Sequence, residues 1–230
     1  MRKIQFANKE FYHIFNRGND KRIIFIDRYD MERFFQSMQE FNTIEPIGSI
    51  FANHFKNQQN NHIAHSHLEA GLPNKPSFQV NTQQDKLVNF ICYCLNPNHY
   101  HFILEQCVDK GVEKFMHRIG TGYSKFFNKK YKRIGTLFEG NYKALHIDSN
   151  EYLLHLSAYV NLNNKAHQLK NTDYKSSWLE YSDEKHDQKF CAKNIVLDQF
   201  KTRAEYKQFA EKSLVDILEK KKLQQGMLLE

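Results

Sequence analysis

Two histidines separated by one residue are the part of this sequence best suited to chemistry. His99 and His101 follow the turn-forming segment Asn96-Pro97-Asn98. Apolar runs rich in β-forming residues stand on both sides of this turn, so we expect two antiparallel strands over about 87–106. Residues two apart on a strand share a face, so both imidazoles should point one way and Tyr100 the other. Two adjacent imidazoles can hold a divalent metal and leave coordination positions for substrate oxygens.

Two other interpretations of the histidine pair stay open from the residues alone. A His-x-His pair is more often two polar residues on a half-buried strand than a metal site, because so short a motif has low specificity. The pair could also join Cys92 and Cys94 in a structural zinc site, which would be closed and four-coordinate.

The composition limits the class of protein. The chain has 230 residues, 14% of them aromatic, and a formal net charge of +7. This length predicts one domain, or one domain with an appendage, and the charge favours an acidic partner such as nucleic acid. Four cysteines give no disulfide framework, so a reducing cytoplasmic location is the simplest expectation. We find no apolar stretch of membrane-spanning length and no signal peptide, and we expect no membrane partner.

The periodicity of apolar residues predicts an α+β fold. The order is strand, helix, strand, strand, helix, strand, which is the βαββαβ pattern of ferredoxin-like and RRM-like domains, with an antiparallel sheet and two helices on one face. Helices should follow in the C-terminal part. The expected elements are strands near 11–15, 87–95 and 99–106, a turn followed by a strand within 135–147, and helices near 27–41, 111–131, 149–160, 194–200 and 203–222.

Two segments lie outside this core pattern. Residues 43–84 are dominated by Asn, Gln, His, Ser, Gly and Pro, which predicts a long polar insertion loop. Its histidines are expected to bind metal adventitiously or to have no role, because no cysteine or carboxylate frame surrounds them: His54, His62, His65 and His67. Residues 164–230 are expected to form a C-terminal helical extension of a domain that spans 1–163.

A tyrosine and several basic residues could act together with a metal-bound phosphodiester. Tyr123 lies in the middle of the expected helix 111–131, and a phenolate beside a two-histidine metal site could attack phosphorus and form a covalent phosphotyrosine. Periodicity alone favours a core aromatic at this position instead. The candidate phosphate contacts, which could equally be solvated side chains, are Arg17, Lys21, Arg22, Lys129, Lys130, Lys132 and Arg133.

Several separate motifs, taken in order, resemble those of REP-associated tyrosine transposases. These are relatives of the single-tyrosine, IS200-like transposases of the HUH endonuclease superfamily. The resemblance covers about residues 10–180. The segments that carry it are 12–19 (YHIFNRGN), 96–104 (NPNHYHFIL), 123–128 (YSKFFN), 135–140 (GTLFEG), 159–163 (YVNLN) and 176–178 (SSW).

The resemblance implies a metal-dependent endonuclease and strand transferase that acts on single-stranded DNA beside short hairpins of repeated palindromic elements. It implies His99 and His101 as ligands of Mg²⁺ or Mn²⁺ and Tyr123 as the nucleophile that forms a 5′-phosphotyrosine. A polar residue about one helical turn beyond the tyrosine can complete the metal site in this family. Position 127 is Phe, so we assign that role to Asn128.

Alternatives remain for both the function and the oligomeric state. The same fold could be a non-catalytic module that binds single-stranded nucleic acid, and related proteins act either as homodimers that exchange helices or as monomers.

The sequence departs from the family pattern at three positions. Asn96 stands where Met is common, Asn141 where Arg is common, and Asn164 where Pro is usual.

Overall fold

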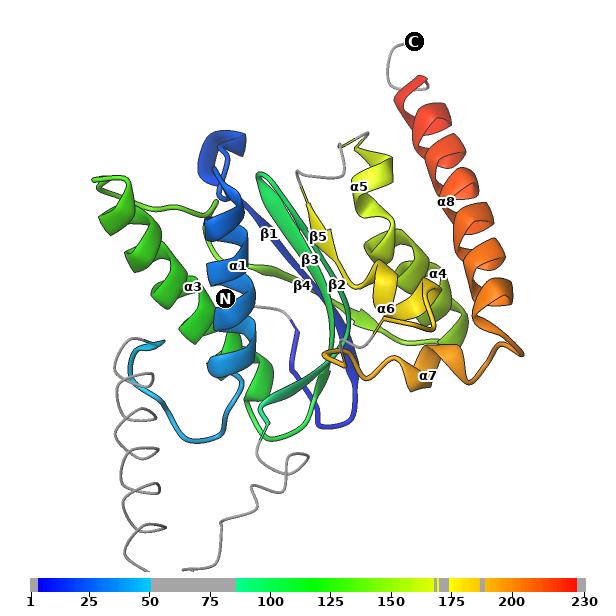
Figure 1. Cartoon of the computed structure of the whole chain (residues 1–230), viewed down its shortest axis with the longest axis horizontal. Helices are drawn as coiled ribbons and strands as arrows, with labels where there is room; N and C mark the ends of the chain where they lie inside the picture. Colours follow the sequence, from blue (N-terminus) through cyan, green and yellow to red (C-terminus); the bar gives the residue numbers. More distant parts are fainter. Residues whose placement is uncertain (1–3, 51–85, 168, 170–173, 187–188, 227–230) are drawn as a thin grey trace, which may run out of the picture.

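The protein forms one antiparallel sheet between two layers of helices (Figure 1). The computed structural model describes residues 4–50, 86–167, 169, 174–186 and 189–226. The elements are β1 (Phe11–Arg17), a 3₁₀ turn η1 (Asn19–Lys21), α1 (Arg28–Glu40), β2 (Val88–Asn96), β3 (His99–Gln106), α3 (Gly111–Lys130), β4 (Lys143–Ile147), α4 (Asn150–Asn161), α5 (Asn163–Ala166), β5 (Lys175–Ser176), α6 (Trp178–Ser182), α7 (Asn194–Leu197) and α8 (Arg203–Gly226).

The sheet has the strand order β4-β1-β3-β2-β5, and every neighbouring pair is antiparallel. The first four strands have the order expected of a split βαβ fold, so the predicted α+β class and βαββαβ topology are confirmed. The hairpin of β2 and β3 places Asn96 opposite His99 and Val88 opposite Gln106, with a bulge between Phe90 and Cys92. Strand β3 is therefore the central strand of the sheet.

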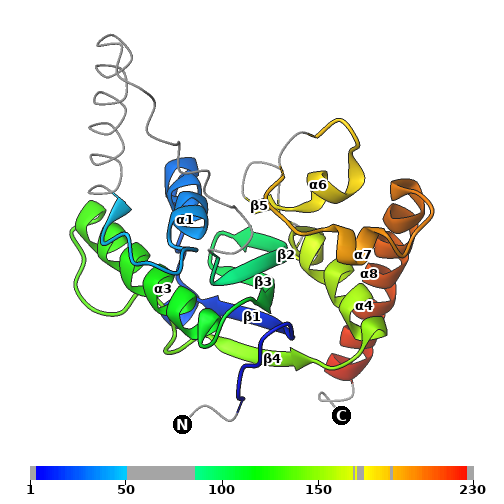
Figure 2. The ribbon, with the colours of Figure 1, turned by 90° about the horizontal axis from the view of Figure 1, so that it is seen from below.

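The two faces of the sheet are covered by different helices. Helices α1 and α3 pack on one face, where the ring of Phe34 in α1 lies 5.4 Å from that of Tyr100 and 6.3 Å from that of Phe102. Helix α4 packs on the opposite face, with α8 behind it (Figure 2). The two helices of the split βαβ unit thus lie on one face as predicted, and the later helices build a second layer on the other face.

Polar residues tie the two helices of the first layer together. Asp27 caps α1 by accepting a hydrogen bond from the backbone of Asp30, whose own side chain accepts from the backbone of Asp27. From the end of α3, the Lys130 ammonium lies 2.7 Å from Asp27 and 2.8 Å from the fully buried Asp30, and the Tyr131 hydroxyl donates to Asp30 at 2.8 Å. The buried carboxylate is therefore paired and hydrogen-bonded.

A buried polar network joins the second helical layer to the sheet. The Tyr206 hydroxyl of α8 lies 3.0 Å from the Asn161 amide nitrogen and 3.1 Å from the Ser157 hydroxyl, both on α4. The Ser177 hydroxyl donates to the side-chain oxygen of Asn161 at 2.6 Å and accepts from the backbone N–H of Tyr93 in β2 at 2.9 Å. The C-terminal segment therefore packs against α4 and β2 of its own chain.

Most of the expected elements are found close to their predicted bounds. Of the predicted insertion, only residues 43–50 belong to the described part of the chain, so the expectations for His54, His62, His65 and His67 lie outside it. Among the helices that the structure describes, none combines the length and the apolar character needed to cross a bilayer. The division into 1–163 and 164–230 stays a prediction.

We expect two glycines of α3 to respond in opposite directions to alanine. A Cβ on Gly111 would lie 2.2 Å from the backbone oxygen of Leu87, whereas a Cβ on Gly120 would meet nothing within 4 Å. Gly111→Ala should lower the free energy of unfolding by about 1–3 kcal/mol through overpacking. Gly120→Ala should raise it by up to about 1 kcal/mol through helix propensity. Urea denaturation measures both, and equal effects of the two substitutions would contradict the packing described here.

Candidate active site

The two histidines of β3 lie on the sheet face that α4 covers. The register pairs His99 with Arg17 and His101 with Phe15 on β1, and directly paired residues share a face. Tyr100, which pairs with Asn16, points to the opposite face. The predicted orientation of His99 and His101 is therefore found, with the imidazoles on the side of the C-terminal layer.

Hydrogen bonds orient the His99 ring. Its Nδ1 lies 2.6 Å from the side-chain oxygen of Asn98, whereas Nε2 lies 2.9 Å from the Asn96 amide nitrogen and 3.1 Å from the Asn163 oxygen. The short contact to an acceptor at Nδ1 and the donor at Nε2 favour a proton on Nδ1 and a lone pair on Nε2. That lone pair accepts from the Asn96 amide nitrogen at 2.9 Å. The arrangement matches the tautomer that a metal-ligating histidine needs.

An asparagine just beyond α4 completes a set of ligand atoms around His99. The Asn163 side-chain oxygen lies 3.1 Å from His99 Nε2 and accepts from the Asn96 amide nitrogen at 2.6 Å. Asn163 is fully buried, and its amide nitrogen has no hydrogen-bond partner among the described residues. Two lone pairs, from an imidazole and from an amide oxygen, thus converge on one polar N–H group, as they would on a cation.

The His101 ring is held between aromatic rings and a third histidine. Its Nδ1 lies 2.9 Å from Nε2 of His13, and the two rings stack with centroids 5.2 Å apart. The ring of Phe15 stacks on His101 at 5.6 Å. His13 is buried, and this burial lowers its pKa to about 4.

Tyr159 stands beside His101 on helix α4. The two ring centroids lie 5.7 Å apart in an edge-to-face arrangement, and the tyrosine is only partly buried. Tyr159 lies in the last turn of α4, and Asn163 is the first residue of α5, four positions further along the chain. The tyrosine and the amide oxygen therefore approach the histidine pair together.

Tyr123, which the sequence assigned as nucleophile, lies on the other side of the sheet. It is fully buried, its hydroxyl donates to the Ile24 backbone oxygen at 2.6 Å, and its ring packs edge-on against Phe34 at 4.8 Å. Burial raises the pKa of this phenol, so the hydroxyl stays protonated. Helix α3 packs against the Tyr100 side of β3, and the sheet thus separates Tyr123 from His99 and His101.

Asn128, which the sequence analysis assigned as a metal ligand, forms its side-chain hydrogen bonds with the loop that follows α3. Its amide nitrogen donates to the Gly135 backbone oxygen at 2.8 Å, and its oxygen accepts from Arg133 at 3.2 Å. These bonds fix the loop after α3. In place of Tyr123 and Asn128, the structure brings Tyr159 and Asn163 to the histidines.

The atoms near His99 and His101 that could hold a divalent cation are two imidazole nitrogens and one amide oxygen. Within the described residues, no three His, Cys, Asp or Glu side chains are grouped so as to hold a metal ion. Burial raises the pKa of the Cys94 thiol to about 12 and that of Cys92 well above its usual range, so both thiols stay protonated in the metal-free protein. Two imidazoles and an amide oxygen leave positions for phosphate oxygens and water, as Mg²⁺ and Mn²⁺ require.

The basic turn after β1 lies at the end of the sheet that carries His99. The Gly18 backbone N–H donates to the Asn98 backbone oxygen at 2.8 Å, and the Asn98 amide donates to the Lys21 backbone oxygen at 3.2 Å. A cavity of about 300 Å³ opens here beside His99, lined by Ile23, Pro97, Asn98, His99, His167 and Leu169. The turn and the histidine site can therefore face the same ligand.

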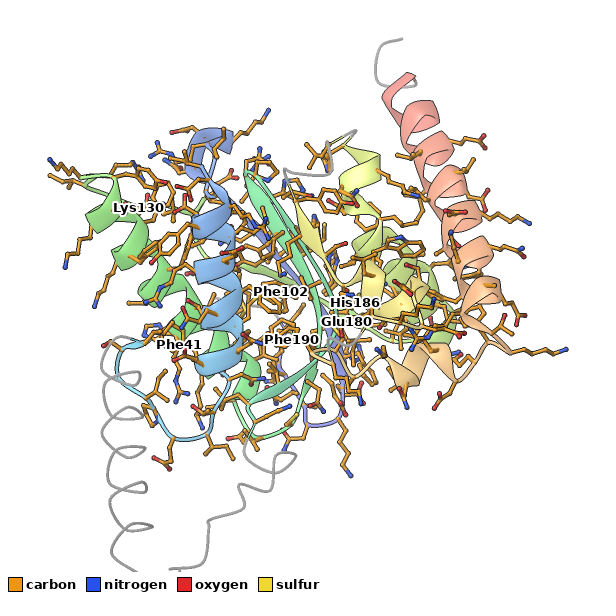
Figure 3. The ribbon with its side chains drawn as sticks, viewed as in Figure 1. Phe41, Phe102, Lys130, Glu180, His186 and Phe190 are labelled. Atoms are coloured by element: carbon orange, nitrogen blue, oxygen red, sulfur yellow. The ribbon has the colours of Figure 1, made fainter. Side chains whose placement is uncertain are left out.

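The seven predicted phosphate contacts differ in how far they are already engaged. Arg17 forms an ion pair with Glu139 through two hydrogen bonds, and Lys130 is held by Asp27 and Asp30 (Figure 3). Arg22 lies 3.8 Å from Asp20, and Arg133 donates to Asn128. Lys21, with Arg17, helps to lower the pKa of the Glu139 carboxyl. Lys129 and Lys132 are exposed and form no ion pair among the described residues.

Comparison with known proteins supports the family resemblance. Residues 76–163 match the family model described as "Transposase IS200 like", and this segment includes His99, His101, Tyr159 and Asn163. The match confirms, for this segment, the transposase-like character that the motifs indicated. A search of curated protein sequences finds no significant match.

Two solved structures resemble the chain weakly. A REP-associated tyrosine transposase bound to a REP hairpin is 9% identical, with a TM-score of 0.39 and 73% of each chain covered. The tRNA(His) guanylyltransferase of Saccharomyces cerevisiae is 10% identical, with a TM-score of 0.32, 73% of this chain and 63% of that chain covered. These scores are too low for either likeness to bear on function.

We expect substitution of the exposed lysines to weaken DNA binding, and substitution of Lys130 to lower the stability of the fold. Replacing Lys129 and Lys132 with alanine should lower the salt dependence of single-stranded DNA binding by ~0.7 for each phosphate that a lysine no longer neutralises. Lys130→Ala should instead lower the free energy of unfolding by about 1–3 kcal/mol, because it removes the only cation paired with the buried Asp30 among the described residues and leaves it only neutral hydrogen-bond donors. Fluorescence anisotropy over a salt series and urea denaturation measure the two effects. A salt slope reduced by Lys130→Ala alone would contradict this assignment.

Proposed function

We propose that the protein is a metal-dependent endonuclease and strand transferase for single-stranded DNA, with Tyr159 as its nucleophile. The observation that carries the proposal is the approach of Tyr159 and Asn163, four residues apart, to His99 and His101 on one face of the sheet. Tyr159 takes the role that the sequence assigned to Tyr123. Its segment, 159–163, was already among the motifs that carry the family resemblance.

The metal site follows from the ligand atoms that converge on this face. His99 and His101 would each bind Mg²⁺ or Mn²⁺ through Nε2, because Asn98 and His13 orient the two Nδ1 atoms. Asn163, whose side-chain oxygen lies 3.1 Å from Nε2 of His99, would bind through that oxygen. A cation held there supplies Lewis-acid polarisation of the scissile phosphate and neutralises charge that develops in the transition state. The Asn96 amide, which donates to both His99 and Asn163, has to release them when a cation binds.

The chemical step is a transesterification at phosphorus. The Tyr159 oxygen forms a bond to phosphorus and loses its proton to solvent, while the bond from phosphorus to the 3′ oxygen breaks. The released 3′ oxygen takes up a proton, and the 5′ phosphate stays on the tyrosine. Attack by another 3′ hydroxyl reverses these changes and joins a new strand, which makes the protein a strand transferase.

The substrate follows from the basic turn and from the family motifs. The turn at 17–22 lies beside His99, so its basic side chains and backbone N–H groups can position a phosphate backbone next to the site. From the motif resemblance we propose that the substrate is single-stranded DNA beside a hairpin formed by a repeated palindromic element.

A second candidate function is a non-catalytic module for single-stranded nucleic acid. The Asn96 amide satisfies His99 and Asn163 without any metal, and Asn96 is one of the positions that depart from the family pattern. In that case a divalent metal would not alter the affinity for DNA, and the DNA would not be cleaved.

The nucleophile can be identified by a matched pair of tyrosine substitutions. Tyr159→Phe removes the hydroxyl beside His101 and should abolish the covalent adduct with single-stranded DNA in Mg²⁺ or Mn²⁺. Tyr123→Phe removes the hydroxyl bonded to Ile24 and should retain adduct formation, with a free energy of unfolding lower by about 1 kcal/mol. Denaturing gel electrophoresis detects the adduct, and mass spectrometry of its peptides locates it.

Each outcome has a defined meaning. An adduct on Tyr123, or full activity of Tyr159→Phe, would overturn the site proposed here. DNA binding by the parent without any adduct, in the presence of either metal, would favour the non-catalytic module.

The site should act within a single chain. His101 contacts Tyr159 of the same chain. The packing of α8 along α4 holds α4, and with it the tyrosine, in place. A mixture of His99→Ala and Tyr159→Phe should therefore stay inactive, since neither chain carries a complete site.

Recovery of activity in that mixture would show that α4 is exchanged between two chains. It would support the homodimer that the family resemblance leaves open. Sedimentation of the parent with and without DNA gives the oligomeric state under the same conditions.

A further inference from the structure

We propose that His13 is a positioning residue that fixes the tautomer and the orientation of His101, so that Nε2 of His101 faces the metal. The inference rests on the proposed metal role of His101. It concerns a residue in the segment 12–19 to which neither the motifs nor the comparison assigns a task.

The geometry joins His13 to His101 specifically. His13 lies on β1, two residues from Phe15, which is the direct cross-strand partner of His101. Its Nε2 is 2.9 Å from His101 Nδ1, within ordinary hydrogen-bond distance, and the two rings are tilted by only 18°. Phe15 contacts both rings, at 4.8 Å and 5.6 Å between centroids, so the three rings form one packed row.

Between two neutral rings, the hydrogen bond allows two arrangements of protons. Either His101 donates from Nδ1 and keeps the Nε2 lone pair, or His13 donates from Nε2 and His101 carries its own proton on Nε2. Only the first arrangement leaves His101 able to bind a metal through Nε2. His13 thus has to accept, which places its own proton on Nδ1.

The other histidine of the pair follows the same rule with a different partner. His99 donates from Nδ1 to the Asn98 oxygen and presents Nε2 to Asn163. Both proposed ligands are therefore oriented by an acceptor at Nδ1, an amide oxygen for one and an imidazole nitrogen for the other. A residue that only filled space on this face would not need a nitrogen at this point.

The competing interpretation is that His13 is a buried aromatic that merely packs. It is 6% exposed and surrounded by rings, so a packing role alone would account for its burial. The two interpretations differ in what a shape-preserving substitution does. Leucine keeps apolar bulk but cannot accept a hydrogen bond, and glutamine can accept through its side-chain oxygen.

The test compares His13→Leu, His13→Gln and His146→Leu with the parent. His146 is a histidine of the same sheet that bonds to Glu10, and it serves as the matched control. Loss of an outer-shell partner typically costs 10–100-fold in metal affinity, so His13→Leu should weaken Mn²⁺ binding by about that factor. His13→Gln and His146→Leu should bind within about threefold of the parent. Electron paramagnetic resonance titration measures Mn²⁺ binding, and His99→Ala gives the background from the rest of the chain.

A second readout needs no metal. Nitrogen-15 NMR of the histidine rings should find the His101 proton on Nδ1 in the metal-free parent and in His13→Gln, and mostly on Nε2 or exchanging in His13→Leu. Parental Mn²⁺ affinity together with an unchanged tautomer in His13→Leu would overturn the proposal. If that variant fails to fold, a His101 proton on Nε2 in the parent overturns it without any substitution.

The same experiment separates this inference from the proposed function. Mn²⁺ binding by His99→Ala and His101→Ala that equals parental binding would remove the metal site itself, and both proposals would fall. Parental binding that depends on His99 and His101 but not on His13 would leave the proposed function intact and remove only the positioning role.

Discussion

The alternation of side chains along the central strand is the constraint on which the rest of this structure depends. His99 and His101 take one face of β3, and Tyr100 between them takes the other. The apolar layer of α1 and α3 gathers around Tyr100 and Phe102, and the polar site gathers on the opposite face. A shift of one residue in the register would exchange the two sets, so a single pairing pattern fixes both the core and the site.

The second helical layer completes the site. Helix α4 brings Tyr159 to the histidines, and the start of α5 brings Asn163. Helix α4 is itself tied to the sheet and to α8 through buried polar groups of Asn161, Ser177 and Tyr206. Such a network stabilises one arrangement because every displaced group would lose a buried hydrogen bond. The C-terminal segment therefore has a defined part in holding the tyrosine beside His101.

The sequence was sufficient for the fold and for half of the proposed site. Periodicity and turn chemistry predicted the split βαβ topology, the hairpin and the common face of His99 and His101, because these depend on local spacing. The proposed nucleophile moves from α3 to α4, because the face of the sheet on which a helix packs is a long-range property. The signal in the sequence that could have indicated the proposed site is the motif 159–163, in which Tyr159 and Asn163 are four residues apart. His13 could not be found from the sequence, since its partner lies on another strand.

The location of a bound metal tests the central claim most directly. Anomalous diffraction from crystals of the protein grown with Mn²⁺ would show the ion and its ligands. Our account predicts one ion bound by Nε2 of His99, Nε2 of His101 and the side-chain oxygen of Asn163, with the Tyr159 hydroxyl facing an open coordination position. An ion bound by Cys92 and Cys94 with these histidines, or by the histidines together with Asn128, would contradict it.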